Sequence, residues 1–491
     1  MKRIAALLAL ATLSGCLIGP DYERPPPAAA PSAEYKEAMG FRPAVPRDAI
    51  DRGPWWSMYG DPTLDQLAAQ VDISNQNLKV SEAAYRQARA LIRQAQSPLY
   101  PTVGYTGGSQ QIGSGAQRGG GNSVGQFSGG STLSWEIDVW GNIRRQIESD
   151  SAAAQASAGT LASARLSAQS DVTTNYFSLR ISEQRTRLFQ ESVAAFARSL
   201  QIVQNQLDAG IASRVDLTQA QTLFEQTRAQ LVAEAINRAQ FEHAIAVLVG
   251  KQPSDFSIAA APLPPNVPTV DAGIPSAMLE RRPDIAAAER QMAAANAQIG
   301  VALGAFYPNI TLNGSIGFLN TMLGPLFQIA SAVWSIGPQL AGTLLDGGAR
   351  SAQVEGARAN YDGTVATYRQ TVLTAFQQVE DELVQQRVLE QQEQVQRAAV
   401  GSAREAEQLA LNQYRAGTVP YTTVVTTQTT ALSAEQTLLN IRLSRFTASA
   451  VMVKSLGGGW RDTDLPAPTP IAGQQSGKAL KKSSWWSWWP F

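Results

Sequence analysis

The run from about Gly141 to Leu207 contains no proline and repeats its apolar residues every three or four positions. Steps of 4, 3, 4, 3 and 4 residues separate Phe189, Val193, Phe196, Leu200, Val203 and Leu207. This spacing is typical of a coiled coil, because a mean period of 3.5 residues keeps one stripe of the helix facing a partner. The helix would reach on the order of 100 Å at about 1.5 Å per residue. Helices of globular cores average about 11 or 12 residues, so we expect this one to run beside other long helices.

The same pattern occurs twice along the chain, at an offset of 207 residues. The recurring landmarks are Tyr100-Pro101 and Tyr307-Pro308, Asp208-Ala209-Gly210 and Arg415-Ala416-Gly417, Val249-Gly250 and Leu456-Gly457, and Gln221 and Gln428. A constant offset across helix, strand and turn residues predicts a tandem duplication with two similar copies. We assign 61–250 to the first repeat, 251–275 to a proline-rich connector, 276–457 to the second repeat and 458–491 to a tail.

The first 15 residues have the pattern of a secretory signal peptide: a basic start, an apolar run from Ile4 to Leu13, and small residues before Cys16. Cys16 is the only cysteine, and Leu13-Ser14-Gly15-Cys16 resembles the lipobox of bacterial lipoproteins, in which the cysteine is acylated. Several acyl chains on one residue give stable membrane attachment. The resemblance, with Leu17 next, implies sorting to the outer membrane. Residues 16–60 are proline-rich and are expected to form a tether.

Period-2 alternation predicts two hairpins, at about 101–140 and 309–345. The apolar positions are Phe127, Leu133, Trp135, Ile137 and Val139 in the first copy, and Ile310, Leu312, Ile316, Phe318, Trp334, Ile336, Leu340 and Leu344 in the second. Strands of about 10 residues cross a membrane when tilted, and Trp135, Trp140 and Trp334 would suit its interfaces. Soluble hairpins packed on a core are the alternative.

Helices are expected over Pro62–Gln96, then over Gly141–Leu207 and Gly348–Gln413, with return helices over Val215–Val249 and Tyr421–Leu456. No stretch reaches the 18 or more apolar residues of a membrane-spanning helix. Four strands cannot close a barrel, and an open sheet edge in lipid leaves backbone groups unpaired. The chain must therefore oligomerise if its strands enter a membrane, as a dimer with eight strands or a trimer with twelve.

The inventory of reactive side chains argues against an enzyme. The single histidine, His243, lies on a predicted helix, and neither a metal-ligand cluster nor a phosphate-binding loop is found. The 40 basic and 40 acidic residues balance, which gives no basic face for nucleic acid. We expect no cofactor beyond a covalent lipid on Cys16.

Several motifs resemble the TolC-like outer-membrane factor family, and within it the OprM-like lipoprotein branch of RND-type multidrug efflux. They are Gly19-Pro20-Asp21-Tyr22, Trp55-Trp56, Arg281-Arg282-Pro283-Asp284, Ala305-Phe306-Tyr307-Pro308 and Leu456-Gly457-Gly458-Gly459-Trp460. The resemblance implies a mainly α protein with a transmembrane β-barrel part, in which a homotrimer forms a twelve-stranded barrel, a periplasmic barrel of twelve helices and an equatorial belt. It also implies a passive exit duct that docks to a periplasmic adaptor protein and an inner-membrane pump. A secretion duct and a periplasmic coiled-coil scaffold are the alternatives.

The glycine turns end the long helices and are the expected periplasmic tips, with docking residues Gly210, Ile211, Gly417 and Thr418. The gate candidates lie in the first turns of the return helices and include Asp216, Tyr421, Thr422 and Thr426. The family often has an apolar residue and an aspartate at the positions of Thr422 and Thr426, so no aspartate ring is predicted here. We expect closure by side-chain packing and by tip contacts of Tyr421 and Asp216.

The tail from Lys481 to Phe491 holds two lysines and four tryptophans: Trp485, Trp486, Trp488 and Trp489. Tryptophan and lysine side chains suit a membrane interface or a protein partner. A disordered C-terminus is the alternative, and no family motif matches these residues.

Overall fold

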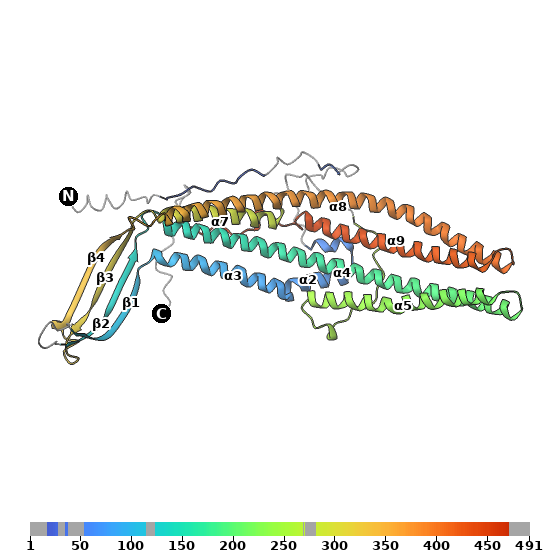
Figure 1. Cartoon of the computed structure of the whole chain (residues 1–491), viewed down its shortest axis with the longest axis horizontal. Helices are drawn as coiled ribbons and strands as arrows, with labels where there is room; N and C mark the ends of the chain where they lie inside the picture. The colour runs from blue at the N-terminus through green and yellow to red at the C-terminus, as the bar shows by residue number, and fades with distance from the viewer. Residues whose placement is uncertain are drawn as a thin grey trace.

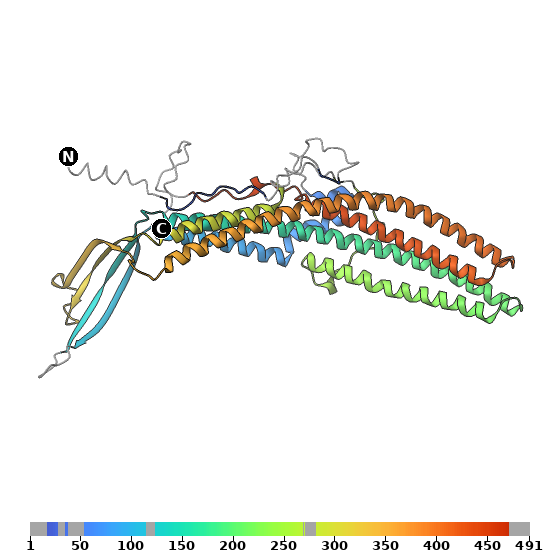
Figure 2. The ribbon, with the colours of Figure 1, turned by 45° about the horizontal axis from the view of Figure 1, so that its top comes forward.

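The computed structural model describes residues 17–27, 35–37, 54–113, 123–268, 270 and 281–470. The expected signal peptide, Cys16 and the tryptophan-rich residues therefore lie outside the described part of the chain. The molecule is elongated, with a sheet at one end and two helical hairpins whose turns lie at the other end (Figure 1; Figure 2).

The four strands form one antiparallel sheet in the order β1-β2-β3-β4. Their bounds are β1 Thr102–Gly113, β2 Ser123–Glu136, β3 Asn309–Asn320 and β4 Ala332–Ala341. The lengths of 10 to 14 residues confirm the predicted hairpins. The two hairpins join through β2 and β3, which leaves β1 and β4 as the two edges.

The predicted alternation extends further than the strands. Ile137 and Val139 lie beyond the end of β2, and Leu344 lies beyond the end of β4, so their assignment to strands is wrong. Ile137 still donates its backbone N–H to the Ile310 carbonyl at 2.8 Å. The alternation of apolar and polar residues therefore continues past the residues at which the strands end.

The two faces of the sheet differ in chemistry. On one face, Ser134 Oγ donates to Asn313 Oδ1 at 3.1 Å, and Asn313 Nδ2 donates to Gln339 Oε1 at 3.0 Å. The other face exposes large apolar side chains, among them Tyr105, Ile316, Trp334, Ile336 and Leu340. The sheet thus has one polar face, crossed by side-chain hydrogen bonds, and one apolar face.

The helical body confirms the duplication. Its helices are α2 Pro62–Ser74, α3 Gln76–Gln96, α4 Asn142–Asp208, α5 Arg214–Leu248, α7 Pro283–Gly304, α8 Ala349–Arg415 and α9 Tyr421–Ser455. The helices α4 and α8 each have 67 residues, α5 and α9 each have 35, and both pairs begin and end 207 residues apart. The long helices therefore repeat in length as well as in pattern.

The single helix predicted over Pro62–Gln96 is broken at Asn75, which separates α2 from α3. Asn75 has an extended backbone, and its Oδ1 accepts a hydrogen bond from the Leu78 N–H at 3.0 Å, capping α3. Its Nδ2 also donates to the Leu248 carbonyl at 2.7 Å, at the end of α5. The asparagine side chain can hydrogen bond to nearby backbone groups in place of the helical bonds. Here the bond to Leu248 adds a tertiary contact that stabilises the break.

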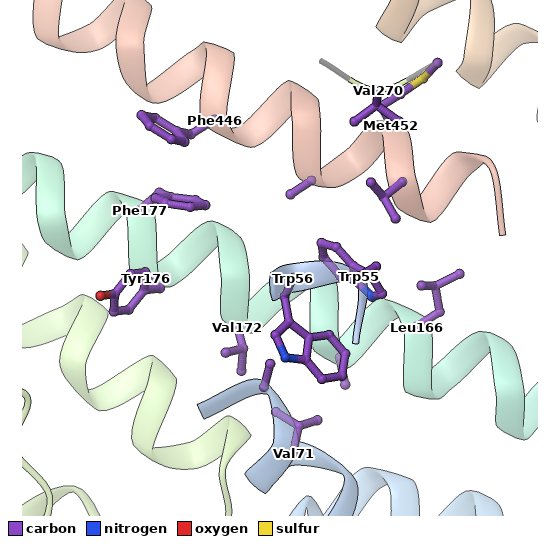
Figure 3. Packing of buried hydrophobic residues seen from close by; sticks show 14 of the residues in the cluster. Trp55, Trp56, Val71, Leu166, Val172, Tyr176, Phe177, Val270, Phe446 and Met452 are labelled. Atoms are coloured by element: carbon purple, nitrogen blue, oxygen red, sulfur yellow. The ribbon is translucent and has the colours of Figure 1, made fainter. Parts of the chain in front are cut away.

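The core lies at mid-length, where both repeats meet. The short helix η1 Trp55–Tyr59 packs its aromatic rings against α4 and its neighbours, with Trp56 pointing toward Val71 of α2 (Figure 3). Phe177 of α4 stacks on Phe446 of α9 with ring centroids 4.4 Å apart, and Tyr59 is hydrogen bonded to Ser449 at 2.6 Å. The aromatic rings therefore fix the two halves to each other midway between the sheet and the tips.

Candidate functional site

The predicted tip residues Gly210, Ile211, Gly417 and Thr418 occupy two matching turns. Gly210 and Gly417 have φ values of 75° and 74°, a left-handed backbone that glycine adopts without steric cost. The Ile211 N–H donates to the Gln206 carbonyl at 2.8 Å, and the Thr418 N–H donates to the Gln413 carbonyl at 3.0 Å. These bonds satisfy carbonyl groups at the ends of the long helices within each turn. Ile211 itself is 75% exposed.

Tyr421, one of the predicted gate residues, lies inside the protomer. Only 2% of it is exposed, and its ring meets that of Tyr414 edge to face with centroids 5.0 Å apart. Val203 and Val424 complete this small tip core. Burial, then Tyr414 and Asp216, raise the pKa of Tyr421 to about 12. The ring thus joins the two helical hairpins within one copy of the chain.

Asp216 is engaged at the start of α5. Its carboxylate accepts hydrogen bonds from the Ser213 N–H at 3.0 Å and from Ser213 Oγ at 2.8 Å, while the Asp216 N–H donates to Ser213 Oγ at 3.1 Å. This reciprocal pattern is a capping box, which satisfies backbone donors at a helix start. The predicted gate residue therefore stabilises the turn that follows Gly210.

Thr422 and Thr426 line an open groove between α5 and α9, just behind the tips. The groove has a volume of about 740 Å³. It is lined by Arg214, Val215, Thr218, Gln219, Thr222, Leu223, Gln226, Thr422, Val425, Thr426 and Thr429. Arg214 lies in the first turn of the return helix, where the gate was expected, but sequence analysis did not find the α5 side of this groove, including Thr218 and Thr222. The sequence did contain a signal for this side: polar residues recur every four positions at the start of α5, at Arg214, Thr218, Thr222 and Gln226.

Four of the five threonine hydroxyls in the groove donate to carbonyls of their own helices. Thr426 Oγ1 donates to the Thr422 carbonyl at 2.9 Å, and Thr429 Oγ1 donates to the Val425 carbonyl at 2.9 Å. Such back-bonding occupies the hydroxyl and leaves the methyl group outward. Arg214 is the only charged residue in the lining, and no carboxylate pairs with it among the described residues. The groove is therefore weakly polar with one positive charge.

The other end of the helical body holds the segment that follows Cys16. Ile18 donates its N–H to the Trp140 carbonyl at 3.2 Å, next to the start of α4. Arg145, whose side chain is 1% exposed, donates to the Ile18 carbonyl at 3.0 Å and the Gly19 carbonyl at 3.1 Å. Gly19 has a φ of 103°, and an added Cβ would lie 2.5 Å from the Gly300 Cα. Residues 18 and 19 are thus fixed where the sheet meets the helices.

The predicted interfacial tryptophans differ in their surroundings. Trp135 donates its ring N–H to the Leu99 carbonyl at 3.0 Å, and Trp140 donates to the Pro308 carbonyl at 2.9 Å. Both bonds lie where strands and helices join, whereas Trp334 is exposed on β4. Within the described residues, no helix is both long and apolar enough to span a membrane, and no three metal-ligating side chains gather.

Comparison with known proteins gives matches over nearly the whole chain. The family described as "Outer membrane efflux protein" matches residues 67–251 and 274–458. The toluene efflux pump outer membrane protein TtgC of Pseudomonas putida is 31% identical over 466 residues, covering 93% of this chain and 96% of that protein. The probable outer membrane lipoprotein SilC of Salmonella typhimurium is 29% identical over 466 residues, covering 92% and 98%. The solved structure of the outer-membrane channel OprN superposes with a TM-score of 0.84 at 28% identity, covering 91% of this chain and all of that one.

Proposed function

This chain belongs to the outer membrane efflux protein family, and we propose that three copies of it form a passive duct across the outer membrane. The membership confirms the resemblance seen in the motifs and makes the chain the outer-membrane component of an efflux system. Efflux is thereby favoured over the secretion duct and the periplasmic scaffold that the residues alone left open.

The observation that carries the proposal is the four-stranded sheet with two open edges and two unlike faces. Unpaired backbone groups in lipid cost several kcal/mol each, so β1 of one copy is expected to pair with β4 of the next. Three copies supply twelve strands, with the hydrogen-bonded Ser134, Asn313 and Gln339 facing the bore and Ile316 and Trp334 facing lipid. Native mass spectrometry of the detergent-solubilised protein tests this arrangement. A mass of three protomers is expected, and a stable monomer would contradict it.

Acylation of Cys16 is the second part of the proposal. Ile18 is bonded beside Trp140 at the junction of sheet and helices, so a lipid on Cys16 would enter the membrane next to the barrel. The relative SilC, named an outer membrane lipoprotein, supports this assignment. The lipid would insert into the periplasmic leaflet, because the helical body is expected to extend from the sheet into the periplasm.

The tips are proposed to dock a periplasmic adaptor protein, which links the duct to an inner-membrane pump of the RND type. The exposed Ile211 and the open turns at Gly210 and Gly417 are the contact residues. Since TtgC is named for toluene efflux, small apolar toxic compounds are the proposed substrates. The energy for transport comes from the pump, and this chain supplies the path.

The groove between α5 and α9 is proposed to face the bore and to form the gate, with Thr422 and Thr426 on one side and Arg214 on the other. Three copies would then surround the axis with methyl groups and three positive charges. This lining differs from an aspartate ring, and closure would depend on how closely the helices approach.

Single-channel recording in planar bilayers with a salt gradient tests the gate. Thr426→Asp and Arg214→Gln should each raise the cation-to-anion permeability ratio by about twofold or more, because a charge 4 Å from an ion is worth about 1 kcal/mol even in water. Arg228→Gln is the control, since Arg228 pairs with Glu225 at 3.6 Å on the exposed surface of α5 outside the groove. A reversal potential unchanged by both variants would contradict a groove that faces the bore.

A further inference from the structure

The loop between β3 and β4, residues 321–331, lies at the end of the sheet that is away from the helices (Figure 1; Figure 2). No charged residue occurs between positions 309 and 345, so neither this loop nor its two strands carry a charge. Ile329 of the loop is 92% exposed. Four large apolar residues of the loop are exposed, and we call them the loop patch: Met322, Leu323, Phe327 and Ile329. An exposed apolar patch is typical of a surface that contacts a partner or lipid.

The loop keeps several of its hydrogen-bonding groups inside. Asn320 Nδ2 donates to Ser331 Oγ at 2.6 Å, and Ser331 Oγ donates to the Pro325 carbonyl at 2.9 Å. Asn320 Oδ1 accepts a hydrogen bond from the Met322 N–H at 3.0 Å. Ser331 is buried, as is Leu326. The loop thus folds as one unit that turns these polar groups inward and the loop patch outward, which is unusual for a loop surrounded by water.

A contact between two rings places the loop on the apolar face of the sheet. Phe327 meets Phe318 edge to face, with ring centroids 5.6 Å apart. Successive side chains of a strand point to opposite faces, so Phe318 shares its face with the exposed Ile316. Asn313 and Ser315, which are hydrogen bonded to side chains of β4, lie on the other face. The loop therefore continues the apolar face beyond the last residue of β3.

The first hairpin differs at the same height. Ser109 pairs with Phe127, and Phe127 pairs with Asn320, so Ser109 is level with the end of β3. By alternation, Ser109 and Gln111 lie on the same face of β1 as the exposed Tyr105. This face of β1 therefore becomes polar at the level where β3 leads into its apolar loop. Within the described residues, the loop patch belongs to the second hairpin alone.

Lipid is the occupant that fits the loop patch. The sheet of this family lies in the outer membrane, and its apolar face is assigned to lipid under the proposed function, on which this inference rests. The loop patch is continuous with that face through Phe318. With the helical body in the periplasm, the opposite end of the sheet reaches the outer leaflet. We propose that the loop patch inserts among the acyl chains of the outer leaflet and anchors each copy at the outer rim of the barrel.

The neighbouring copy fits the loop patch less well. In the proposed trimer, β4 of one copy pairs with β1 of the next copy, and the outer part of that β1 carries Ser109 and Gln111 on this face. Polar side chains gain little by covering exposed apolar residues, whereas acyl chains remove their apolar surface from water. Together with the lipid on Cys16, the loop patch would attach each copy to both leaflets.

A label on the loop tests the proposal in the full-length protein. Ile329→Cys is labelled with an environment-sensitive fluorophore and reconstituted into phosphatidylcholine vesicles whose acyl chains are brominated near their carbonyl ends. Bromine quenches a fluorophore that it contacts. Trp334→Cys reports on the sheet face itself, Ser213→Cys reports on the distant tip, and the unsubstituted chain reports any label on Cys16. We expect quenching at 329 to be close to that at 334 and several-fold above that at 213.

Two further substitutions in the labelled Ile329→Cys protein assign the effect to the loop. Phe327→Asn removes the ring that packs on Phe318 and should lower the quenching toward the level at 213. Leu319→Asn is the matched control, because Leu319 is also exposed but follows Phe318 directly and lies on the opposite face of β3. It should leave the quenching unchanged.

The labels at 329 and 334 separate failure of this proposal from failure of the barrel. Strong quenching at 334 with none at 329 would overturn the loop anchor and leave the barrel intact. Aqueous iodide would then show the reason, since it reaches a loop in water but not a loop covered by the next copy. Absence of quenching at 334 would contradict the barrel, and with it the anchor.

Discussion

The two repeats have the same helices but bury them very differently. Twenty-nine residues of α4 are buried, against eleven of α8, although both helices have 67 residues. Among the described helices, α2, α3, α5, α7 and α9 all pack on α4, whereas α8 packs mainly on α7 and α9. Duplication therefore set the lengths and turns, while the place of each copy in the protomer sets its burial. The edge strand β4 leads into α8, so the proposed trimer is expected to add the next copy beside α8.

The equivalent arginines Arg180 and Arg387 bind different segments, each together with a neighbouring charged side chain. In the first repeat, Arg180 donates to the Ala259 carbonyl at 2.8 Å and Arg238 donates to the Ile258 carbonyl at 2.7 Å, so both hold the connector. In the second, Arg387 pairs with Glu37, and Glu380 accepts the N–H groups of residues 36 and 37 at 2.9 Å. The corresponding regions of the two repeats thus bind segments of unrelated sequence, residues 258 and 259 in one case and residues 36 and 37 in the other.

The largest expected difference between the repeats is at the starts of α4 and α8. Arg145→Ala should destabilise the protein by about 3 kcal/mol or more, because it removes a buried arginine that donates to two carbonyls and to the carboxylates of Asp21 and Glu148. Arg350→Ala, which breaks the partly exposed pair with Asp346 in the second repeat, should cost far less, because solvent screens such a pair. Thermal unfolding followed by circular dichroism measures both, and equal losses would contradict the asymmetry.

A smaller difference is expected between the equatorial and tip turns. Gly250→Ala and Gly457→Ala should each cost about 3 kcal/mol, since a left-handed alanine is strained and its Cβ would lie 2.3 Å from the Ser74 carbonyl oxygen or 1.9 Å from that of Arg281. Gly210→Ala and Gly417→Ala should cost only the strain, about 1 kcal/mol, because nothing lies near the added atom. The same unfolding measurement applies, and tip variants as damaging as the equatorial ones would show that the turns are not free.

The smallest effect concerns Glu382, whose equivalent in the first repeat is Asn175. Burial, then Asp381, raise the pKa of Glu382 to about 7 from the ordinary 4.5. The folded protein therefore binds the proton more tightly than the unfolded chain, and stability falls as pH rises from about 4.5 to about 7. Glu382→Gln should raise the unfolding temperature at pH 8 and leave it unchanged at pH 4. A benefit of the same size at both pH values would contradict this origin.

The sequence predicted the repeated architecture because it depends on patterns that repeat along the chain. The apolar steps and the glycine turns located α4 and α8 to within about two residues at each end. The break at Asn75 was missed because its cause is a hydrogen bond to Leu248, far away in sequence.

At the tip, the sequence located the right turns, and the structure adds contacts of two side chains that it did not predict. Tyr421 was expected at the gate, yet its ring packs on Tyr414 within the protomer, and Asp216 caps its own helix. The sequence did not predict the bonds from Arg145 to the Ile18 and Gly19 carbonyls, since an arginine on an amphipathic helix usually faces water. Gate, docking and lipidation remain predictions, and the single-channel recordings above address the gate.

The matched lengths of α4 with α8 and of α5 with α9 set how far the tips lie from the sheet. Losing seven residues from one of them alone would leave the turns uneven and shift every contact beyond the cut. Losing a heptad from all four would shorten the body by roughly 10 Å and leave the seam in phase. Ducts of this kind that serve periplasms of other widths would thus change length only in concerted steps.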